Sequence, residues 1–304
     1  MIMSTYKTQI DVNDVQMFLK QNFQNVSNIR KIVGGESSQA YSFICSEGKR
    51  ILRVNANGNQ GFLKDFLAYK RFNSIDTPIP AILTVGEMAK NVYFAVSVQA
   101  EGKMVSKLTR QQHETILPEL VKILDHIHSL TPIADGYGEW DTEGKGEHNS
   151  WQNVLLARLE ENWDETKAAP FYDESLHDEL RGQIRGLLKF CPDTRTLVHG
   201  DFGLENLFSD GDRITGVIDW EMSMYGDFLY DIAWLDRLGT GHGYEEIFKE
   251  YYKSQNRLPE NYSQRIQCYK LCIALDSLGF YAYSRQPNKY QNIKSTLLRQ
   301  KHNN

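Results

Sequence analysis

The sequence predicts an α+β protein with a small β-rich amino-terminal part and a larger, mainly helical carboxy-terminal part. Before residue 100, short apolar runs alternate with turn residues, which is typical of strands. After Gly102, apolar residues recur at intervals of three and four, which is typical of amphipathic helices. The length of 304 residues is enough for about two domains. We therefore expect two lobes, residues 1–100 and 101–304, joined by a hinge near residues 99–102.

The amino-terminal lobe is expected to contain two helices and five strands. Asp11 can cap a helix that starts at Val12, because a short acidic side chain accepts the free N–H groups of a first helical turn. Aromatic residues at helical spacing predict a second helix over residues 61–72. The β-like runs lie at residues 29–33, 40–45, 50–55, 82–85 and 92–98.

The carboxy-terminal lobe is expected to be helical around one short β segment. Apolar residues from Ile116 to Leu130 mark one helix face, and Pro118 predicts that this helix starts late or is kinked. Residues 135–146 are rich in glycine and are expected to form a loop. Further helices are predicted over residues 151–167 and 174–190, and from residue 227 to the end with breaks at residues 239–243 and Pro259.

Composition argues against several classes of protein. The formal net charge of −5 lacks the basic bias of a nucleic-acid-binding protein. No apolar run approaches the ~18 residues that span a bilayer, and the first residues do not resemble a signal peptide. The four cysteines form no CxxC pair and are expected to be buried thiols. We expect a cytoplasmic protein that binds neither nucleic acid nor a membrane.

The segment LVHGDFGLENLF, residues 197–208, places polar side chains between two apolar strand ends. Asp201 and Asn206 are five residues apart, which is the spacing of the catalytic loop of kinases. A carboxylate can accept a hydrogen bond from an acceptor hydroxyl and take its proton. An amide oxygen can bind Mg²⁺ without adding negative charge beside phosphates. The spacing therefore predicts phosphoryl transfer.

The residues that follow strengthen this interpretation. Residues 207–218 read as a strand, a turn over residues 209–212 and a second strand. Such a hairpin places Asn206 and Asp219 near each other at its open end. Their oxygen atoms predict a Mg²⁺ site, because hard cations prefer oxygen ligands. The alternative is that Asp201 and Asp219 only cap turns at strand ends.

The amino-terminal lobe offers candidate nucleotide contacts. Ser37 and Ser38 follow two glycines in a strand–turn–strand setting, where hydroxyl and amide groups can contact phosphates, although a plain hairpin turn fits as well. Arg53 lies in an otherwise apolar strand and needs an anionic partner, for which a phosphate is suitable. Asp65 is a candidate counter-ion for Arg53, and a solvated helix face is the alternative explanation of this acid.

The motifs HGDFGLEN, VIDW and GDFLYDIAW together resemble the aminoglycoside phosphotransferase family. Within it, the segments GGESSQAYSF, ILRVN and GFLKDFLAYKRF are most similar to the hygromycin B phosphotransferases. The resemblance extends from about residue 30 to about residue 235. It implies a bilobal, protein-kinase-like fold, with a nucleotide-binding amino-terminal lobe and a carboxy-terminal lobe that carries the catalytic loop and the acceptor site.

The resemblance also implies roles for the matching residues. Asp201 would be the base for the acceptor hydroxyl, and His199 would support its loop. Asn206 and Asp219 would bind Mg²⁺. The nucleotide phosphates would meet Arg53, and the adenine would meet backbone groups near Gln99 and Ala100. Asp227 and Asp231 would have structural roles, in which they cap or complement the helix that begins there.

The expected function is transfer of a phosphoryl group from ATP, or GTP, with Mg²⁺ to a hydroxyl of a cationic aminoglycoside such as hygromycin B, which confers resistance. A kinase of another small hydroxylated molecule, such as a macrolide, a sugar or an amino alcohol, is the first alternative. A non-catalytic nucleotide-binding protein of kinase shape is the second. Glu205 and Asp236 could bind ammonium groups of the acceptor or could be surface acids.

Overall fold

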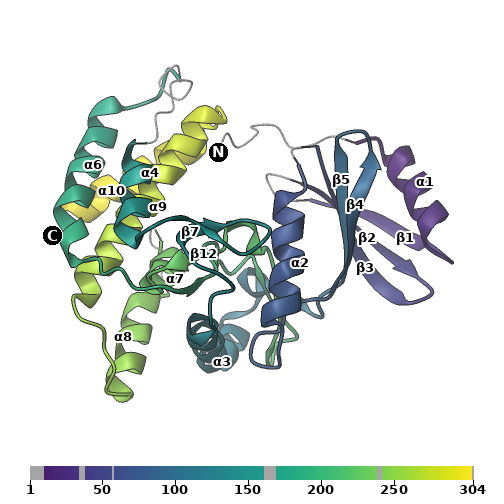
Figure 1. Ribbon diagram of the computed structural model, residues 1–304, viewed down its shortest axis with the longest axis horizontal. Helices are drawn as coiled ribbons and strands as arrows, with labels where there is room; N and C mark the ends of the chain where they lie inside the picture. The colour runs from purple at the N-terminus through teal and green to yellow at the C-terminus, as the bar shows by residue number, and fades with distance from the viewer. Residues whose placement is uncertain (1–9, 34–37, 57, 161–168, 238–241, 303–304) are drawn as a thin grey trace. The chain divides into compact units, whose positions relative to one another are not determined.

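A computed structural model gives the arrangement of the helices and strands labelled in Figure 1. The structure describes residues 10–33, 38–56, 58–160, 169–237 and 242–302. None of the helices in these ranges is long and apolar enough to cross a membrane.

The chain forms two compact units. The first unit comprises Met1–His126 and Leu204–Met222, and the second comprises Ile127–Gly203 and Ser223–Asn304. Residues 204–222 therefore belong to the same unit as the β-rich start of the chain. The lobes expected over residues 1–100 and 101–304, and the functions assigned to them, stay predictions.

A five-stranded antiparallel sheet forms the centre of the first unit, with the strand order β1-β2-β3-β5-β4. The five predicted strands are confirmed. Their bounds are β1 (Ser27–Ile32), β2 (Gln39–Cys45), β3 (Gly48–Asn55), β4 (Ile82–Ala89) and β5 (Val92–Val98).

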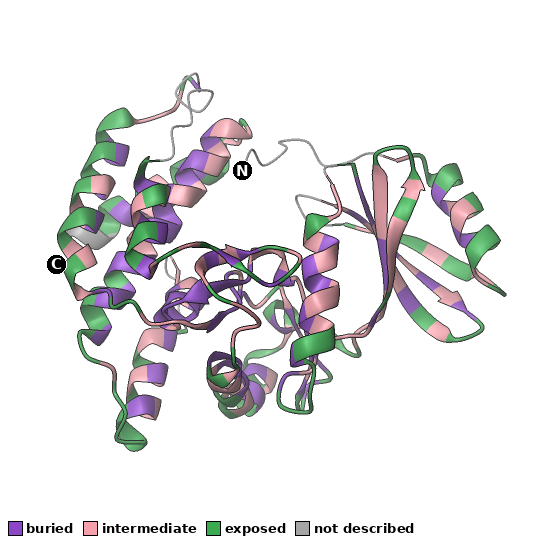
Figure 2. Cartoon of the chain, in the orientation of Figure 1, coloured by how far each residue is buried: buried purple, intermediate pink, exposed green. Residues whose placement is uncertain are grey.

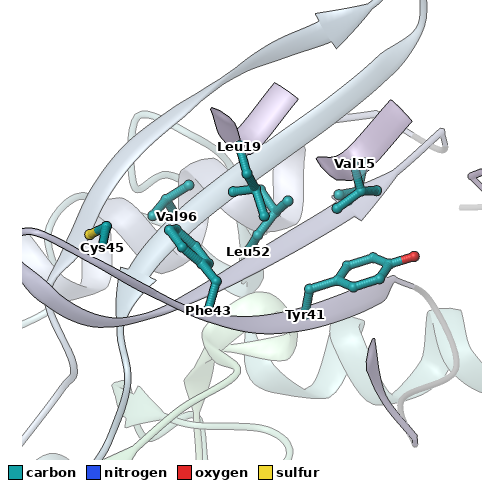
Figure 3. Packing of buried hydrophobic residues seen from close by; sticks show 8 residues of the cluster. Val15, Leu19, Tyr41, Phe43, Cys45, Leu52 and Val96 are labelled. Carbon is teal, nitrogen blue, oxygen red and sulfur yellow. The ribbon is translucent and has the colours of Figure 1, made fainter. Parts of the chain in front are cut away.

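Helix α1 (Val12–Asn22) covers one face of this sheet. The side chain of Asp11 accepts a hydrogen bond of 2.7 Å from the Asn13 N–H, which confirms the predicted cap. Burial of apolar side chains holds the helix on the sheet, as Figure 3 shows. The shared core consists of Val15, Leu19, Tyr41, Phe43, Cys45, Leu52, Val54 and Val96.

The first unit also holds a three-stranded sheet in the order β11-β10-β6. Gly102 precedes this sheet with φ +79°, and a Cβ atom there would lie 1.9 Å from the carbonyl oxygen of Ser209. Glycine is therefore needed for this close approach of two backbones. The elements are β6 (Lys103–Met104), η1 (Val105–Lys107), β10 (Leu207–Ser209), β11 (Ile214–Val217) and η3 (Trp220–Met222).

Helix α3 (Arg110–Ser129) corrects one prediction. Pro118 lies inside the helix and does not delay its start. Thr109 and Gln112 explain the early start, because the Thr109 Oγ1 accepts the Gln112 N–H and the Gln112 Oε1 accepts the Thr109 N–H. These reciprocal hydrogen bonds form a capping box, which satisfies N–H groups that the first turn leaves free.

The second unit contains a four-stranded sheet in the order β8-β7-β12-β9. Part of the predicted glycine-rich loop forms its strands β7 (Tyr137–Trp140) and β8 (Gly146–His148), so the loop prediction was wrong there. A Cβ atom on Gly136 would lie 2.2 Å from the carbonyl oxygen of Gly146. The glycines thus allow the two backbones to approach closely, and they also allow the chain to turn. The other strands are β9 (Thr196–Val198) and β12 (Met224–Gly226).

The helices of the second unit each bury part of their surface, and Figure 2 shows the buried residues in purple. The predicted helices of this part of the chain are confirmed within the described residues. They are α4 (Trp151–Glu160), α6 (Glu174–Leu187), η2 (Leu188–Phe190), α7 (Leu229–Leu235), α8 (Tyr244–Ser254), α9 (Tyr262–Tyr283) and α10 (Pro287–His302). The predicted segments at residues 161–167 and 239–241 lie outside the described residues.

All four cysteines are buried free thiols, as predicted. In the described ranges, no group of three or more His, Cys, Asp or Glu side chains is arranged to hold a metal ion.

Buried His177 of α6 gives the fold a dependence on pH. Burial, aided by Arg181, lowers the pKa of His177 from 6.5 to about 4. Between these two values the unfolded chain binds a proton that the folded chain does not, so the free energy of unfolding falls as pH drops. We expect His177→Phe to remove about 3 kcal/mol of this fall between pH 6.5 and 4. Urea unfolding across this range measures it, and an unchanged slope would contradict it.

Candidate active site

Arg53 lies on the face of the five-stranded sheet opposite α1. Its neighbours Leu52 and Val54 point into the core under α1, and successive side chains of a strand alternate between faces. Ala40 and Ala95 pair with Arg53 on the two adjacent strands. Small side chains therefore flank the guanidinium group.

Helix α2 (Gln60–Phe72) supplies the partners of Arg53. Arg53 donates a hydrogen bond from Nη2 to Oδ2 of the buried Asp65. The Arg53 guanidinium also lies 5.1 Å from the centre of the Phe62 ring. The predicted pairing of Arg53 with Asp65 is confirmed, and the alternative of a solvated acid at position 65 is wrong.

Strands β10 and β11 form the predicted hairpin, which places Asn206 and Asp219 at its open end. Leu207 pairs with Val217, and the Ile218 N–H donates a hydrogen bond of 2.9 Å to the carbonyl oxygen of Asn206. Asp219 follows with φ +66°, in the left-handed region that residues with a side chain rarely adopt. Asn206 therefore directly precedes β10, and Asp219 lies two residues after the end of β11.

The turn at Asp219 is fixed by neighbours from β3 and α2. Arg53 Nη1 lies 4.0 Å from Asp219 Oδ1. The Trp220 N–H donates a hydrogen bond of 2.7 Å to Oδ1 of Asp65. The Trp220 ring stacks on Phe72 with a centroid distance of 6.1 Å. The Asp219 side chain remains 41% exposed, so its carboxylate is accessible to a ligand.

Glu221 is a member of this cluster that the sequence analysis missed. Burial, together with the carboxylates of Asp219 and Asp65, raises the pKa of Glu221 to about 7, although the cations of Arg53 and Lys64 act in the opposite direction. A Cβ atom on Gly61 would lie 2.5 Å from the Glu221 carboxyl carbon, so α2 packs directly on this side chain. An acid after Trp220 looks like a surface residue in the sequence, and only the packing of α2 reveals its burial.

The other predicted nucleotide contacts of the first unit have different outcomes. Ser37 lies outside the described residues, and Ser38 is half-buried just before β2. The Gln99 N–H donates to the carbonyl oxygen of Lys49 at 3.3 Å. Among the residues that the structure describes, nothing hydrogen-bonds the backbone N–H or carbonyl of Ala100. The backbone of Ala100 is therefore available to a ligand, whereas the N–H of Gln99 is occupied.

In the second unit, Asp231 of α7 holds the segment that leads to Asp201. Its fully buried carboxylate accepts the N–H groups of His199 and Gly200, each at 2.8 Å. It also contacts Nε2 of His128 at 3.0 Å. Hydrogen bonds to a carboxylate are strong in a buried setting, so this contact fixes the backbone before Asp201.

The structure separates the roles expected for the two acids of GDFLYDIAW. Asp227 contacts the start of α7, where its Oδ1 accepts the Leu229 N–H at 3.2 Å, and it also pairs with buried Arg265. Asp231 lies in the first turn of α7, where a negative charge complements the helix dipole, and its carboxylate also binds the segment before Asp201. The sequence analysis missed His128, because its partner lies 103 residues away.

His199 and Asp201 are linked by the Asp201 N–H, which lies 3.3 Å from His199 Nδ1. His199 is fully buried, whereas Asp201 is half-buried. This contact supports the expectation that His199 supports the loop. The Asp201 carboxylate is the more accessible group and can serve as a hydrogen-bond acceptor.

The two acids considered for an ammonium contact differ in their surroundings. Glu205 is exposed. Asp236 pairs with Lys270 at 2.7 Å and accepts the Tyr244 N–H at 3.0 Å, and its side chain is only 16% exposed. Asp236 therefore already has a cationic partner within the second unit, which it shares with Glu245.

Comparisons with known proteins identify the family that this chain resembles. Residues 28–264 match the model of the phosphotransferase enzyme family. The chain is 29% identical to the hygromycin-B 4-O-kinase of Escherichia coli over 284 residues, which cover 90% of this chain and 80% of that protein.

Solved structures extend the likeness to three dimensions. A structure of aminoglycoside phosphotransferase APH(4)-Ia with ADP and hygromycin B is 27% identical and has a TM-score of 0.82, with 93% of this chain and 96% of that chain covered. This match confirms the predicted protein-kinase-like fold. The GDP and kanamycin complex of APH(2")-IIIa is 15% identical, with a TM-score of 0.70 and 97% of this chain and 100% of that chain covered. At this identity it shows the fold alone.

The contacts of Asp231 predict a large effect of its replacement. Asp231→Asn leaves one acceptor oxygen for three donors, so we expect the free energy of unfolding to fall by about 3 kcal/mol. Asp178→Asn is the matched control, because Asp178 is 70% exposed and forms an ion pair with Arg181 on its own helix. The control is expected to change stability by less than about 0.5 kcal/mol. Urea unfolding of both variants measures this, and equal effects would contradict the assignment.

Proposed function

We propose that this chain, which belongs to the phosphotransferase enzyme family, transfers the terminal phosphoryl group of ATP to a hydroxyl of an aminocyclitol antibiotic of the hygromycin B class. The observation that carries this proposal is the likeness to the hygromycin-B 4-O-kinase over 90% of the chain. This likeness includes the helices beyond the catalytic segment, and so is not limited to the motifs that phosphotransferases share.

Asp201 is the proposed base. Its carboxylate would accept a hydrogen bond from the acceptor hydroxyl and take the proton as the oxygen–phosphorus bond forms. The buried contacts of Asp231 with His199 and Gly200 support this role, because they fix the backbone that carries Asp201. Orientation of the hydroxyl toward the phosphate is the main contribution expected from this residue.

Asn206 and Asp219 are the proposed ligands of Mg²⁺. An amide oxygen and a carboxylate at one end of a hairpin suit this ion, which commonly takes one or two protein carboxylates and completes its shell with phosphates and water. Asp65 and Asp219 both lie beside Arg53, so two carboxylates share one cation there, which also favours a divalent cation. Bound there, Mg²⁺ would neutralise negative charge on the transferring phosphate.

Arg53 is proposed to contact the nucleotide phosphates, and Ala100 the adenine. The guanidinium group has donors beyond the one that Asp65 occupies, and the Arg53 side chain is 20% exposed. The unpaired backbone groups of Ala100 can pair with the edge of a purine. Gln99, through its carbonyl oxygen, and Ser37 and Ser38, through hydroxyls near the phosphates, complete the proposed set.

Phosphorylation of the acceptor explains a role in drug resistance. A phosphate adds about −1.5 to −2 charge at neutral pH to a molecule that needs its cations to bind RNA. The modified drug would therefore lose affinity for its target. The charge change, together with added bulk, is the proposed basis of resistance.

The acceptor class is tested by a coupled assay that measures release of ADP or GDP in the presence of Mg²⁺. ATP and GTP are each offered with hygromycin B, other aminoglycosides, macrolides, sugars and amino alcohols. We expect release that depends on hygromycin B, and a fall of about 10²–10⁴-fold in the variant Asp201→Ala. Release with another acceptor alone would contradict the substrate class. Nucleotide binding without release for any acceptor would favour a non-catalytic protein.

The Mg²⁺ site is tested by the variant Asp219→Ala. Loss of the carboxylate is expected to remove most of the gain in ADP affinity that Mg²⁺ gives, because the ion loses a ligand. Calorimetry with and without Mg²⁺ measures this gain. Asp212→Ala is the control, since Asp212 is exposed in the turn at the other end of the same hairpin. An unchanged gain in Asp219→Ala would exclude Asp219 as a ligand.

A further inference from the structure

We propose that Asp65 is a positioning residue that sets the backbone turn of Asp219, and so couples the phosphate contact of Arg53 to the Mg²⁺ ligand. The inference rests on the proposed function for the role of Asp219. It goes beyond the Arg53–Asp65 ion pair, because it assigns a separate task to the second carboxylate oxygen.

The two oxygens of Asp65 have different partners. Oδ2 accepts a hydrogen bond from Arg53 Nη2, and Oδ1 accepts the Trp220 N–H at 2.7 Å. The Asp65 side chain is 4% exposed, so water cannot easily replace either contact. A neutral residue of the same shape could supply only one of the two acceptors. The site therefore needs a carboxylate at position 65.

The hydrogen bond from the Trp220 N–H lies next to a residue with an unusual backbone conformation. Asp219 has φ +66°, a conformation that residues other than glycine rarely adopt without support. The N–H group directly after this residue is the one that Asp65 accepts. The turn at Asp219 is therefore held on both sides. The Trp220 N–H binds Asp65, and the Ile218 N–H binds the carbonyl oxygen of Asn206.

The rest of α2 supports the same turn. Gly61 packs against the Glu221 side chain, and Phe72 stacks on the Trp220 ring. Gly61, Asp65 and Phe72 are spaced by four and seven residues, so they share one face of the helix. This face of α2 is complementary to residues 219–222, and Asp65 provides its central polar contact.

Charge adds to the effect of the hydrogen bonds. Asp65 lies between the Arg53 cation and the Trp220 N–H, and Arg53 Nη1 is 4.0 Å from Asp219. With Asp65 present, Arg53 is hydrogen-bonded to Asp65 and only lies near Asp219. Without it, Arg53 is expected to move onto Asp219 and compete with a bound cation for that carboxylate.

The test compares Asp65→Ala and Asp65→Asn with Ala68→Gly. Ala68 is fully buried on the same helix, and glycine there weakens the helix without removing a hydrogen-bonding side chain. The first readout is hydrogen exchange of the Trp220 amide in the unliganded chain. The second is the gain in ADP affinity that Mg²⁺ gives, measured by calorimetry.

We expect Asp65→Ala to speed exchange of the Trp220 amide by about tenfold or more relative to Ala68→Gly. The gain in ADP affinity that Mg²⁺ gives is expected to fall by about tenfold. Asp65→Asn, which keeps the shape if Asp65→Ala fails to fold, is expected to show a smaller effect of the same sign. Weaker ADP binding with an unchanged gain from Mg²⁺ would show that Asp65 serves Arg53 alone and would overturn the proposal.

The exchange readout separates this proposal from the proposed function. It needs neither nucleotide nor acceptor, so failure of the acceptor assay leaves it intact. Unchanged exchange at Trp220 in Asp65→Ala would overturn the positioning role even if the chain phosphorylates hygromycin B.

Discussion

The hydrogen bond from the Trp220 N–H to Asp65 holds the turn of Asp219, and the first unit's part of the site depends on it. Asp231 forms the equivalent contact in the second unit, where it accepts the N–H groups of His199 and Gly200. In both cases a buried carboxylate binds backbone N–H groups, which are otherwise costly to bury. The loops that carry the candidate residues thus gain fixed positions from buried acids that are not themselves candidate ligands or bases.

Burial distinguishes the acids that position from those that are available to a ligand. The Asp65 and Asp231 side chains are 4% and 0% exposed, whereas the Asp219 side chain is 41% exposed. A buried acid with all its acceptors used makes a rigid anchor. An exposed acid on a fixed turn can be reached by a ligand from solvent.

Much of the fold could be predicted from the sequence, because local patterns determine it. The cap at Asp11, the apolar alternation of the five strands and the hairpin between Asn206 and Asp219 are all short-range features. The pairing of Arg53 with Asp65 was also predictable, since a cation in an apolar strand needs a partner. The missed start of α3 was local as well, in the capping box at Thr109.

Other features depend on contacts that span long stretches of chain. Asp65 and the Trp220 N–H are 155 residues apart, and His128 and Asp231 are 103 residues apart. The burial of Glu221 requires the glycine at position 61, which no local pattern connects with it. Glycines in β7 and β8 looked like a loop because the close backbone approach that requires them is tertiary.

The mass of the product is the most direct measure of the proposed phosphorylation of an aminocyclitol. Hygromycin B incubated with the chain, ATP and Mg²⁺ is expected to gain the mass of one phosphoryl group, and the drug should stay unmodified with Asp201→Ala. Unmodified hygromycin B in the presence of a wild-type chain that binds ATP and Mg²⁺ would contradict the account.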